Sequence, residues 1–320
     1  MKVVITDHEF GDVIEERRIA NESNASFEVY DDVKDPAEVA RITQGADVVL
    51  LCYAQITEEV LKGLAPNATV IRYGMGYDTI DVDAATRLGV RVCNVPDYGA
   101  DTVADHTVML ALASIRRLQA YDSALKASDD GWIPAPEIGK IPAMSDVTFG
   151  LLGIGQIGRK VASRVQAFGA RVIAYDPYVS QDALEGTNIT LADLDEFLAE
   201  SDAISLHAPL FPSTHHIINA EAIARMKNSA VLINTARGPL IDTEAAIQAI
   251  EENRLGGLAL DVFETEPLEA GSKLRQLDRV LLTPHAAYYS ERSLANLQLF
   301  AAEEMGRALK GEALRCQVNR

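Results

Sequence analysis

Three polar clusters of this sequence contain residue types that together suit the oxidation of a small hydroxy acid. They are INTARG at 233–238, LALDVFETEP at 258–267 and LLTPHAAYYS at 281–290. The reaction needs a cation for the carboxylate and the reacting oxygen, and a near-neutral base that takes the hydroxyl proton as hydride leaves. Arg237 offers a fixed fork of donors for the first task. His285 suits the second, because histidine alone titrates unperturbed near neutrality.

A carboxylate on the other imidazole nitrogen would orient the ring of His285 and stabilise its protonated form. The segment FETEP offers two candidates, Glu264 and Glu266, and the spacing from Asp261 to the Glu-Pro pair favours Glu266. The histidines at positions 8, 106, 215 and 216 show no partner pattern. The adjacent pair among them lacks a metal-ligand spacing, so no metal site is predicted.

A second constellation is typical of dinucleotide binding. In FGLLGIGQIGRKVASRVQAFGARVIAYDPY, glycines follow an apolar strand and open a helix whose predicted apolar stripe ends at Phe168. Gly153 permits the tight turn, Gly155 lets the backbone approach a pyrophosphate, and Gly158 allows close packing of helix on strand. Asp176 ends the next strand, at roughly the 20-residue spacing of an acid that binds the adenine ribose. Because an acid there repels a 2′-phosphate, we expect NAD rather than NADP.

The elements that must position these residues form two series of short apolar runs alternating with helical patterns. This alternation predicts an α/β fold with parallel sheets, and 320 residues suit two domains. The first series of expected strands is 2–5, 27–30, 47–51, 69–73 and 90–95. The second series is 147–153, 171–176, 203–208, 230–235, 258–263 and 279–285, a count of six that fits a dinucleotide-binding sheet.

Between the two series we expect one long helix and a loop. The helical pattern covers 102–125, is apolar on much of its circumference and is expected to pack between the domains, with Arg116 and Arg117 ending a helix. The Gly- and Pro-rich stretch 127–144 is predicted to be a loop. The segment 290–311 is predicted to be an amphipathic helix that packs on the N-terminal domain.

The bulk composition excludes several classes of function. A net charge of −18 argues against binding to DNA or to anionic membranes. No run approaches the roughly 18 uncharged apolar residues of a membrane span, and the N-terminus reads as a strand rather than a signal peptide. Cys52, Cys93 and Cys316 fall in apolar runs and are expected to be reduced thiols, so a cytoplasmic location is predicted.

Arg237 in NTARG, Glu266 in DVFETEP and His285 in TPH resemble the Arg, Glu and His set of the D-2-hydroxyacid dehydrogenase family, and the resemblance covers nearly the whole chain. It implies that IRYGMGYDTID is a substrate-carboxylate loop. The substrate-binding residues it implies are Tyr73, Gly74, Met75, Gly76 and Tyr288. The NAD-binding residues it implies, beyond the three glycines and Asp176, are Gln156, Ile157, His207, Ala208, Pro209, Thr235, Ala236, Asp261 and Ala287, with Asp261 holding the nicotinamide carboxamide.

The same resemblance implies the domain organisation. We expect a flavodoxin-like substrate domain at 1–98 and 291–320, a Rossmann NAD-binding domain at 99–290, and a homodimer built through the NAD-binding domains. Within the family the sequence is most similar to the C-terminal-binding protein branch, on YDPY, CNVPDYGADTVADHT and PHAAYYSE. Tyr288 stands where animal members of that branch have Trp, so their substrate preference is not transferred.

Three functions share this fold, and the sequence favours the first. It is an NAD-dependent 2-hydroxyacid dehydrogenase or 2-oxoacid reductase. The second is an NAD-sensing co-repressor-type binding protein, which usually has a long disordered tail, whereas this sequence stops soon after its last predicted helix. The third is a relative that oxidises another small anion such as phosphite. Formate is disfavoured because formate dehydrogenases of the family pair the histidine with Gln, and this sequence offers Glu266.

Overall fold

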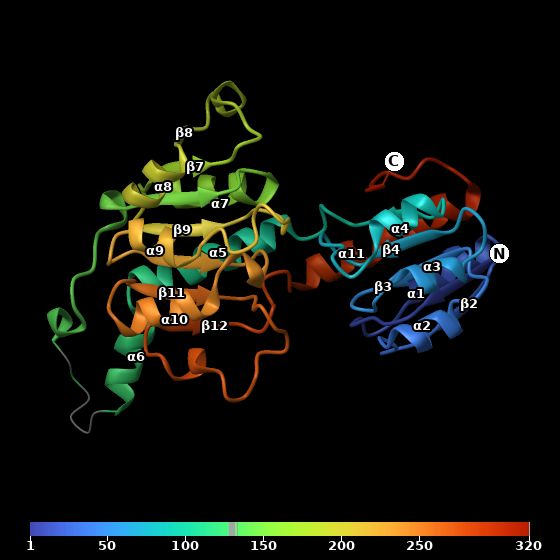
Figure 1. The fold of residues 1–320 in the computed structure, drawn as a ribbon, viewed down its shortest axis with the longest axis horizontal. Coiled ribbons are helices and arrows are strands. Elements are labelled where there is room, and N and C mark those ends of the chain that lie inside the picture. The colour runs from blue at the N-terminus through green and yellow to red at the C-terminus, as the bar shows by residue number, and fades with distance from the viewer. Residues whose placement is uncertain (128–131, 133, 320) are drawn as a thin grey trace. The chain divides into compact units, whose positions relative to one another are not determined.

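The computed structural model describes residues 1–127, 132 and 134–319. The chain divides into two compact units, the first formed by Met1–Gly99 and Tyr289–Arg320 and the second by Ala100–Tyr288. Red helix α11 lies among the blue N-terminal elements of the first unit (Figure 1), so the C-terminal segment returns to the N-terminal fold. Among the described helices, none combines the length and the apolar content that a membrane span requires.

The first unit is a five-stranded parallel sheet covered by helices. The order β2-β1-β3-β4-β5 is the flavodoxin-like arrangement. Its strands are β1 (Lys2–Ile5), β2 (Ser26–Val29), β3 (Val48–Leu51), β4 (Thr69–Arg72) and β5 (Arg91–Cys93). Its helices are α1 (Ile14–Glu22), α2 (Pro36–Ile42), α3 (Glu58–Lys62), α4 (Val82–Arg87) and α11 (Glu291–Lys310).

Helix α11 confirms the prediction for the C-terminal segment, because it packs against α1, β3 and β4 of this unit. Leu297, Ala301 and Met305 of α11 enter the core that α11 shares with β1 and β3. The chain then runs antiparallel along β5, where the N–H of Val318 donates to the carbonyl of Val92 at 2.9 Å.

The second unit is a seven-stranded parallel sheet in the order β12-β11-β10-β9-β6-β7-β8. This is the Rossmann strand order with one further strand at the β12 edge. The strands are β6 (Thr148–Leu152), β7 (Arg171–Tyr175), β8 (Ile189–Leu191), β9 (Ala203–Leu206), β10 (Val231–Asn234), β11 (Gly257–Leu260) and β12 (Val280–Leu282). The helices are α5 (Ala100–Ile115), α6 (Leu118–Ala127), α7 (Gln156–Ala167), α8 (Leu194–Glu200), α9 (Ala220–Arg225) and α10 (Thr243–Glu251).

The three neighbouring strands β9, β10 and β11 are buried along their whole length, as expected of a parallel sheet with helices on both faces. Core residues such as Phe149 and Leu151 of β6, Ile204 of β9 and Ile233 of β10 are inaccessible to solvent. The strand directions place the segments after β6, β7, β9, β10, β11 and β12 at one edge of the sheet. The predicted cofactor and catalytic residues are therefore gathered at this edge.

Three expectations about this unit were wrong. The sheet has seven strands rather than six, because the short strand β8 was missed. The long helix is two helices, since Arg117 adopts a left-handed φ of +54° that interrupts the helical backbone between Ile115 and Leu118. Phe168 does not complete the apolar stripe of α7: it stands at the C-cap and is 51% exposed.

The predicted loop at 127–144 is only partly testable, because 128–131 and 133 lie outside the described residues. Its described part includes the short 3₁₀ turn Ala135–Ile138, and another, Met144–Asp146, begins at its end. The three cysteines are free thiols, as predicted.

Candidate active site

The glycine loop between β6 and α7 has the geometry that its spacing predicts. Gly153 has φ +92°, and a Cβ there would lie 2.8 Å from the carbonyl carbon of His207. A Cβ at Gly158 would lie 2.4 Å from the carbonyl oxygen of Gly153, so this glycine lets helix and loop touch. A Cβ at Gly155 would meet no heavy atom of the described residues within 4 Å. The backbone at Gly155 is thus open to a ligand, and Gln156 and Ile157 begin α7 beside it.

Asp176 follows β7 directly and is tied to the glycine loop. Its carboxylate accepts hydrogen bonds from the N–H of Ile154 and the N–H of Tyr178, each at 3.0 Å. The acid therefore lies beside the loop expected to hold the phosphates. Because an ionised carboxylate only accepts hydrogen bonds, this placement suits ribose hydroxyls and disfavours a 2′-phosphate.

The other predicted cofactor residues follow neighbouring strands of the same sheet. His207, Ala208 and Pro209 come after β9, Thr235 and Ala236 after β10, Asp261 after β11 and Ala287 after β12. Burial lowers the pKa of His207 to about 3, so its ring is neutral, and its Nε2 lies 2.9 Å from Ser205 Oγ. The Thr235 and Thr107 hydroxyls lie 2.8 Å apart. With the open backbone at Gly155, these residues fit a dinucleotide.

The imidazole of His285 is paired with Glu266. Nδ1 of His285 lies 2.7 Å from Oε2 of Glu266, and Oε1 of Glu266 accepts the N–H of Phe263 at 2.9 Å. Burial raises the pKa of Glu266, but the hydrogen bond and charge of His285, the Phe263 N–H and the charge of Arg237 outweigh it and hold this pKa below its ordinary value. Glu266 is therefore ionised at neutral pH. An ionised carboxylate only accepts hydrogen bonds, so Nδ1 of His285 carries the proton of this bond and Nε2 is the other ring nitrogen, on which we expect the reaction to depend.

The alternative carboxylate, Glu264, has other partners. Its Oε1 lies 2.5 Å from Nε2 of His216, and its Oε2 accepts the N–H of Thr243 at 3.0 Å. Of the two candidates that the sequence offered, the structure places Glu266 on His285 and Glu264 on His216. Sequence reasoning had assigned His216 no partner.

Arg237 stands in the turn after β10, and a buried asparagine shapes that turn. Asn234 donates from Nδ2 to the carbonyl of Arg237 at 2.8 Å and accepts the N–H of Ala236 at 3.0 Å. The Arg237 guanidinium donates to the carbonyl of Ala236 at 2.7 Å and is half-buried. Arg237 and the His285–Glu266 pair thus belong to one unit. Sequence reasoning missed Asn234, whose partners are backbone groups.

Asp261 organises the turn that contains His285. It is fully buried, and its carboxylate accepts the Thr283 hydroxyl at 2.5 Å and the N–H groups of Ala286 at 2.8 Å and Ala287 at 2.9 Å. The Asp261 carbonyl accepts the N–H of His285 at 2.7 Å, and His285 has φ +53°. In the structure, the Asp261 carboxylate therefore accepts hydrogen bonds from three groups of its own domain. Its contact with the nicotinamide stays a prediction.

The predicted carboxylate loop follows β4 in the first unit. The Gly74 carbonyl accepts the N–H of Val95 at 2.9 Å, and the Met75 carbonyl accepts Nδ2 of Asn94 at 2.7 Å. Since a trans peptide points its N–H opposite to its C=O, the N–H groups of Met75 and Gly76 point away from Asn94 and Val95. Binding of a carboxylate by these N–H groups stays a prediction, and Asn94, which holds the loop, was not identified from the sequence.

The two tyrosines assigned to the substrate differ in exposure. Tyr73 is 2% exposed, and its hydroxyl donates to Oε1 of the buried Glu16 at 2.9 Å. Its phenol is therefore part of the core, and only its backbone is available to a substrate. Tyr288 is half-buried beside Ala287, whereas the neighbouring Tyr289 is 63% exposed.

Gly238 provides a test of how tightly the catalytic segments pack. A Cβ at this position would lie 1.9 Å from the carbonyl carbon of Phe263 and 2.4 Å from the nitrogen of Glu264. Gly238→Ala must therefore displace the segment that orients Glu266. We expect kcat to fall by about 10²-fold, the cost of a misplacement near 1 Å. Steady-state kinetics measure it, with Gly271→Ala as control because a Cβ there meets no described atom within 4 Å. Wild-type kcat in Gly238→Ala would contradict this packing argument.

Comparison with known proteins agrees with this geometry. Residues 108–287 match the family model described as D-isomer specific 2-hydroxyacid dehydrogenase, NAD binding domain. The chain is 37% identical over 287 residues to a glyoxylate reductase of Thermofilum pendens, covering 88% of this chain and 84% of the relative. It is 38% identical over 284 residues to a D-3-phosphoglycerate dehydrogenase of Synechocystis sp., covering 88% of this chain but only 50% of the relative, so it spans about half the length of that protein.

The fold is shared with solved structures over almost the whole chain. One is the D-lactate dehydrogenase of Aquifex aeolicus complexed with NAD and lactic acid. The TM-score is 0.85 and the identity 30%, and the match covers 98% of this chain and 96% of that one.

Proposed function

Because the chain belongs to the D-isomer specific 2-hydroxyacid dehydrogenase family, we propose that it transfers a hydride between NAD and C2 of a small 2-hydroxy or 2-oxo carboxylic acid. The observation that supports this most is the pair of His285 and Glu266, formed in the same domain as Arg237 and the glycine loop. The cofactor is NAD, which the family's NAD-binding domain and the placement of Asp176 both favour.

The catalytic roles follow from the hydrogen bonds of the three residues. In reduction, protonated His285 donates the Nε2 proton to the carbonyl oxygen of the 2-oxoacid, and the resulting hydroxyl keeps that proton. Glu266 stabilises the imidazolium through Nδ1, and Arg237 stabilises the negative charge that develops on the oxygen. When bound, the nicotinamide supplies the hydride to C2. In oxidation, neutral His285 takes the hydroxyl proton.

We infer that the loop at 74–76 binds the substrate carboxylate through the N–H groups of Met75 and Gly76. Their direction is set by the hydrogen bonds on the carbonyls of Gly74 and Met75. Arg72 adds a positive charge beside the loop, since its guanidinium lies against Gly74. A protein whose net charge is −18 needs such a local cation to attract an acid.

The resemblance to the C-terminal-binding protein branch remains a proposal, supported by the motifs at 92–107, 175–178 and 284–291. Tyr288 after PHAA gives this chain a hydroxyl at a position that we infer faces the substrate. The free thiols support a cytoplasmic location.

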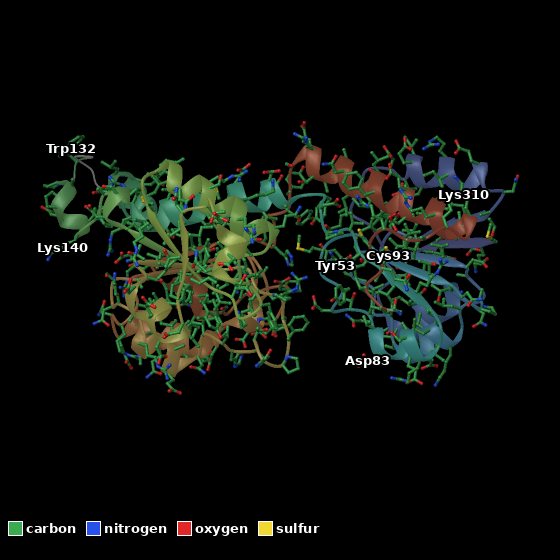
Figure 2. All side chains as sticks on the ribbon, turned by 90° about the horizontal axis from the view of Figure 1, so that it is seen from above. Tyr53, Asp83, Cys93, Trp132, Lys140 and Lys310 are labelled. Carbon is green, nitrogen blue, oxygen red and sulfur yellow. The ribbon has the colours of Figure 1, made fainter. Side chains whose placement is uncertain are left out.

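We propose that two copies associate through their NAD-binding domains. All ten residues of α6 are exposed or half-buried, although Leu118 and Leu125 are apolar. Met109 of α5 is 50% exposed and Trp132 is 80% exposed. Figure 2 shows Trp132 and Lys140 at the outer edge of this unit. Such apolar groups are typical of a surface that a partner covers.

Light scattering after size-exclusion chromatography tests the association. We expect a dimer for the wild type and a monomer for the double variant Leu118→Asp, Trp132→Ala. The charge-matched control Leu88→Asp alters an exposed leucine of the first unit and should stay dimeric. A dimer in all three proteins would place the interface elsewhere.

The function itself is tested by following NADH oxidation with 2-oxoacids of increasing side-chain size, in parallel with NADPH. We expect turnover with NADH, at least about tenfold lower kcat/KM with NADPH because of Asp176, and kcat/KM lowered by about 10³-fold in an Arg237→Ala control. Tight NADH binding without turnover of any 2-oxoacid would instead favour an NAD-sensing binding protein.

A further inference from the structure

The buried acid Asp7 holds the loop that follows β3. Asp7 stands after β1 and is 1% exposed. Its carboxylate accepts three consecutive backbone N–H groups, from Cys52 at 3.2 Å, Tyr53 at 2.6 Å and Ala54 at 3.3 Å, and also the Thr6 hydroxyl at 2.9 Å. A buried carboxylate needs such donors to replace the water it has lost, so the carboxylate of Asp7 fixes the backbone of this loop.

The loop in turn fixes Arg72. The Cys52 carbonyl, which belongs to the segment held by Asp7, accepts Nε of Arg72 at 3.3 Å. On its other side the guanidinium lies against Gly74, because a Cβ built there would be 1.6 Å from Nη1 and 2.8 Å from Cζ of Arg72. The cation is thus located between the Cys52 carbonyl and the first residue of the carboxylate loop.

We propose that Asp7 is a positioning residue for substrate binding: it fixes the loop Cys52–Ala54, whose carbonyl orients Arg72 beside the loop that binds the substrate carboxylate. This inference rests on the proposed function of residues 74–76. Asp7 itself touches no substrate. Figure 2 shows Tyr53, the centre of the held loop, at one end of the sheet of the first unit.

The hydrogen-bond partners of the Asp7 carboxylate determine which kinetic constant it affects. They are Thr6 and the loop 52–54, all in the first unit, whereas the predicted NAD-binding and proton-transferring residues belong to the second. A change at Asp7 should therefore weaken binding of the 2-oxoacid and leave the chemical step and NADH affinity nearly unchanged.

Asp7→Asn is the direct test, because it keeps the shape and replaces one acceptor oxygen by a donor that faces a backbone N–H. We expect KM for glyoxylate to rise by about tenfold or more, the effect of one lost charge-assisted hydrogen bond. We expect kcat to stay within about threefold, and the NADH Kd from fluorescence titration within about twofold. Asp47→Asn is the matched control, since Asp47 accepts the N–H of Lys2 at 2.6 Å just before β3 begins. It should leave KM unchanged.

A double-mutant cycle tests the path through Arg72. Arg72→Lys keeps the charge but removes the Nε donor to Cys52, so adding Asp7→Asn to it should raise KM by less than about twofold further. Full additivity of the two changes would overturn this path. Should Asp7→Asn fail to fold at the assay temperature, Asp7→Glu keeps the carboxylate at a shifted position, and the same selective rise in KM is expected.

Failure of the proposed function and failure of the role of Asp7 give different results in these experiments. A wild-type protein that reduces no 2-oxoacid would refute the proposed function, on which this inference rests. Wild-type turnover with an unchanged KM in both Asp7 variants, or an equal rise in KM in Asp47→Asn, would refute the role of Asp7 alone.

Discussion

His285→Ala is expected to lower kcat by about 10³-fold and to leave the NADH Kd nearly unchanged. The imidazole is the group that we assign to proton transfer, and its Nδ1 is held by Glu266 at 2.7 Å. Alanine removes the proton donor but leaves the glycine loop and Asp176 in place. Stopped-flow measurement of NADH oxidation gives the rate, and fluorescence titration gives the Kd.

The chain contains a matched control for this variant. His216 is paired with Glu264 at 2.5 Å, and the side chains of both His–Glu pairs are about one-third exposed. His216→Ala should therefore keep kcat within about threefold, because His216 has no assigned part in the reaction. Equal losses of turnover and NADH binding in His285→Ala would recast His285 as a structural residue of the turn that Asp261 holds.

Arg237→Ala is expected to reduce kcat/KM for the 2-oxoacid by about 10³-fold, which is the scale observed when a donor to a developing oxyanion is removed. Asn234 holds the backbone around Arg237 on both sides, so truncation of the side chain should leave the turn intact. Arg237→Lys should recover only part of the loss, since an ammonium group lacks the planar fork of the guanidinium.

The control for Arg237→Ala is Arg225→Ala. Arg225 pairs with Asp195 and Glu221 on the surface of the same domain, where ion pairs contribute little to stability. If Arg237→Ala kept the wild-type kcat/KM while His285→Ala lost about 10³-fold in kcat, another cation would have to stabilise the oxyanion.

The sequence predicted those parts of the site that depend on local spacing. The glycine loop, Asp176 and the turn that contains Arg237 each follow an apolar run, and each lies at the end of a parallel strand in the structure. Family resemblance added the loop at 73–76. The pairing of His285 with Glu266 is also present, although only the spacing from Asp261 to the Glu-Pro pair distinguished Glu266 from Glu264.

The features that the sequence did not reveal depend on distant or unusual backbone contacts. Asp7, Asn94 and Asn234 bind main-chain groups, and no pattern of residue types records which carbonyl or N–H a side chain will meet. We expected Arg116 and Arg117 to end a helix, but not a separate helix that begins at Leu118, because the left-handed φ of Arg117 is one that the residue rarely adopts. Strand β8 has only three residues, of which Ile189 alone is buried, so its apolar signal is short.

The C-terminal segment that runs along β5 affects the tendency of the protein to aggregate when it is partly unfolded. Strand β5 is at the edge of its sheet, where unpaired N–H and C=O groups are a template for the strands of other chains. Val318 and Asn319 occupy those groups: the N–H of Val318 donates to Val92, and Asn319 binds Val90 and Val92 through its side chain. Detachment of this segment would therefore turn β5 into an aggregation site while leaving the catalytic groups untouched.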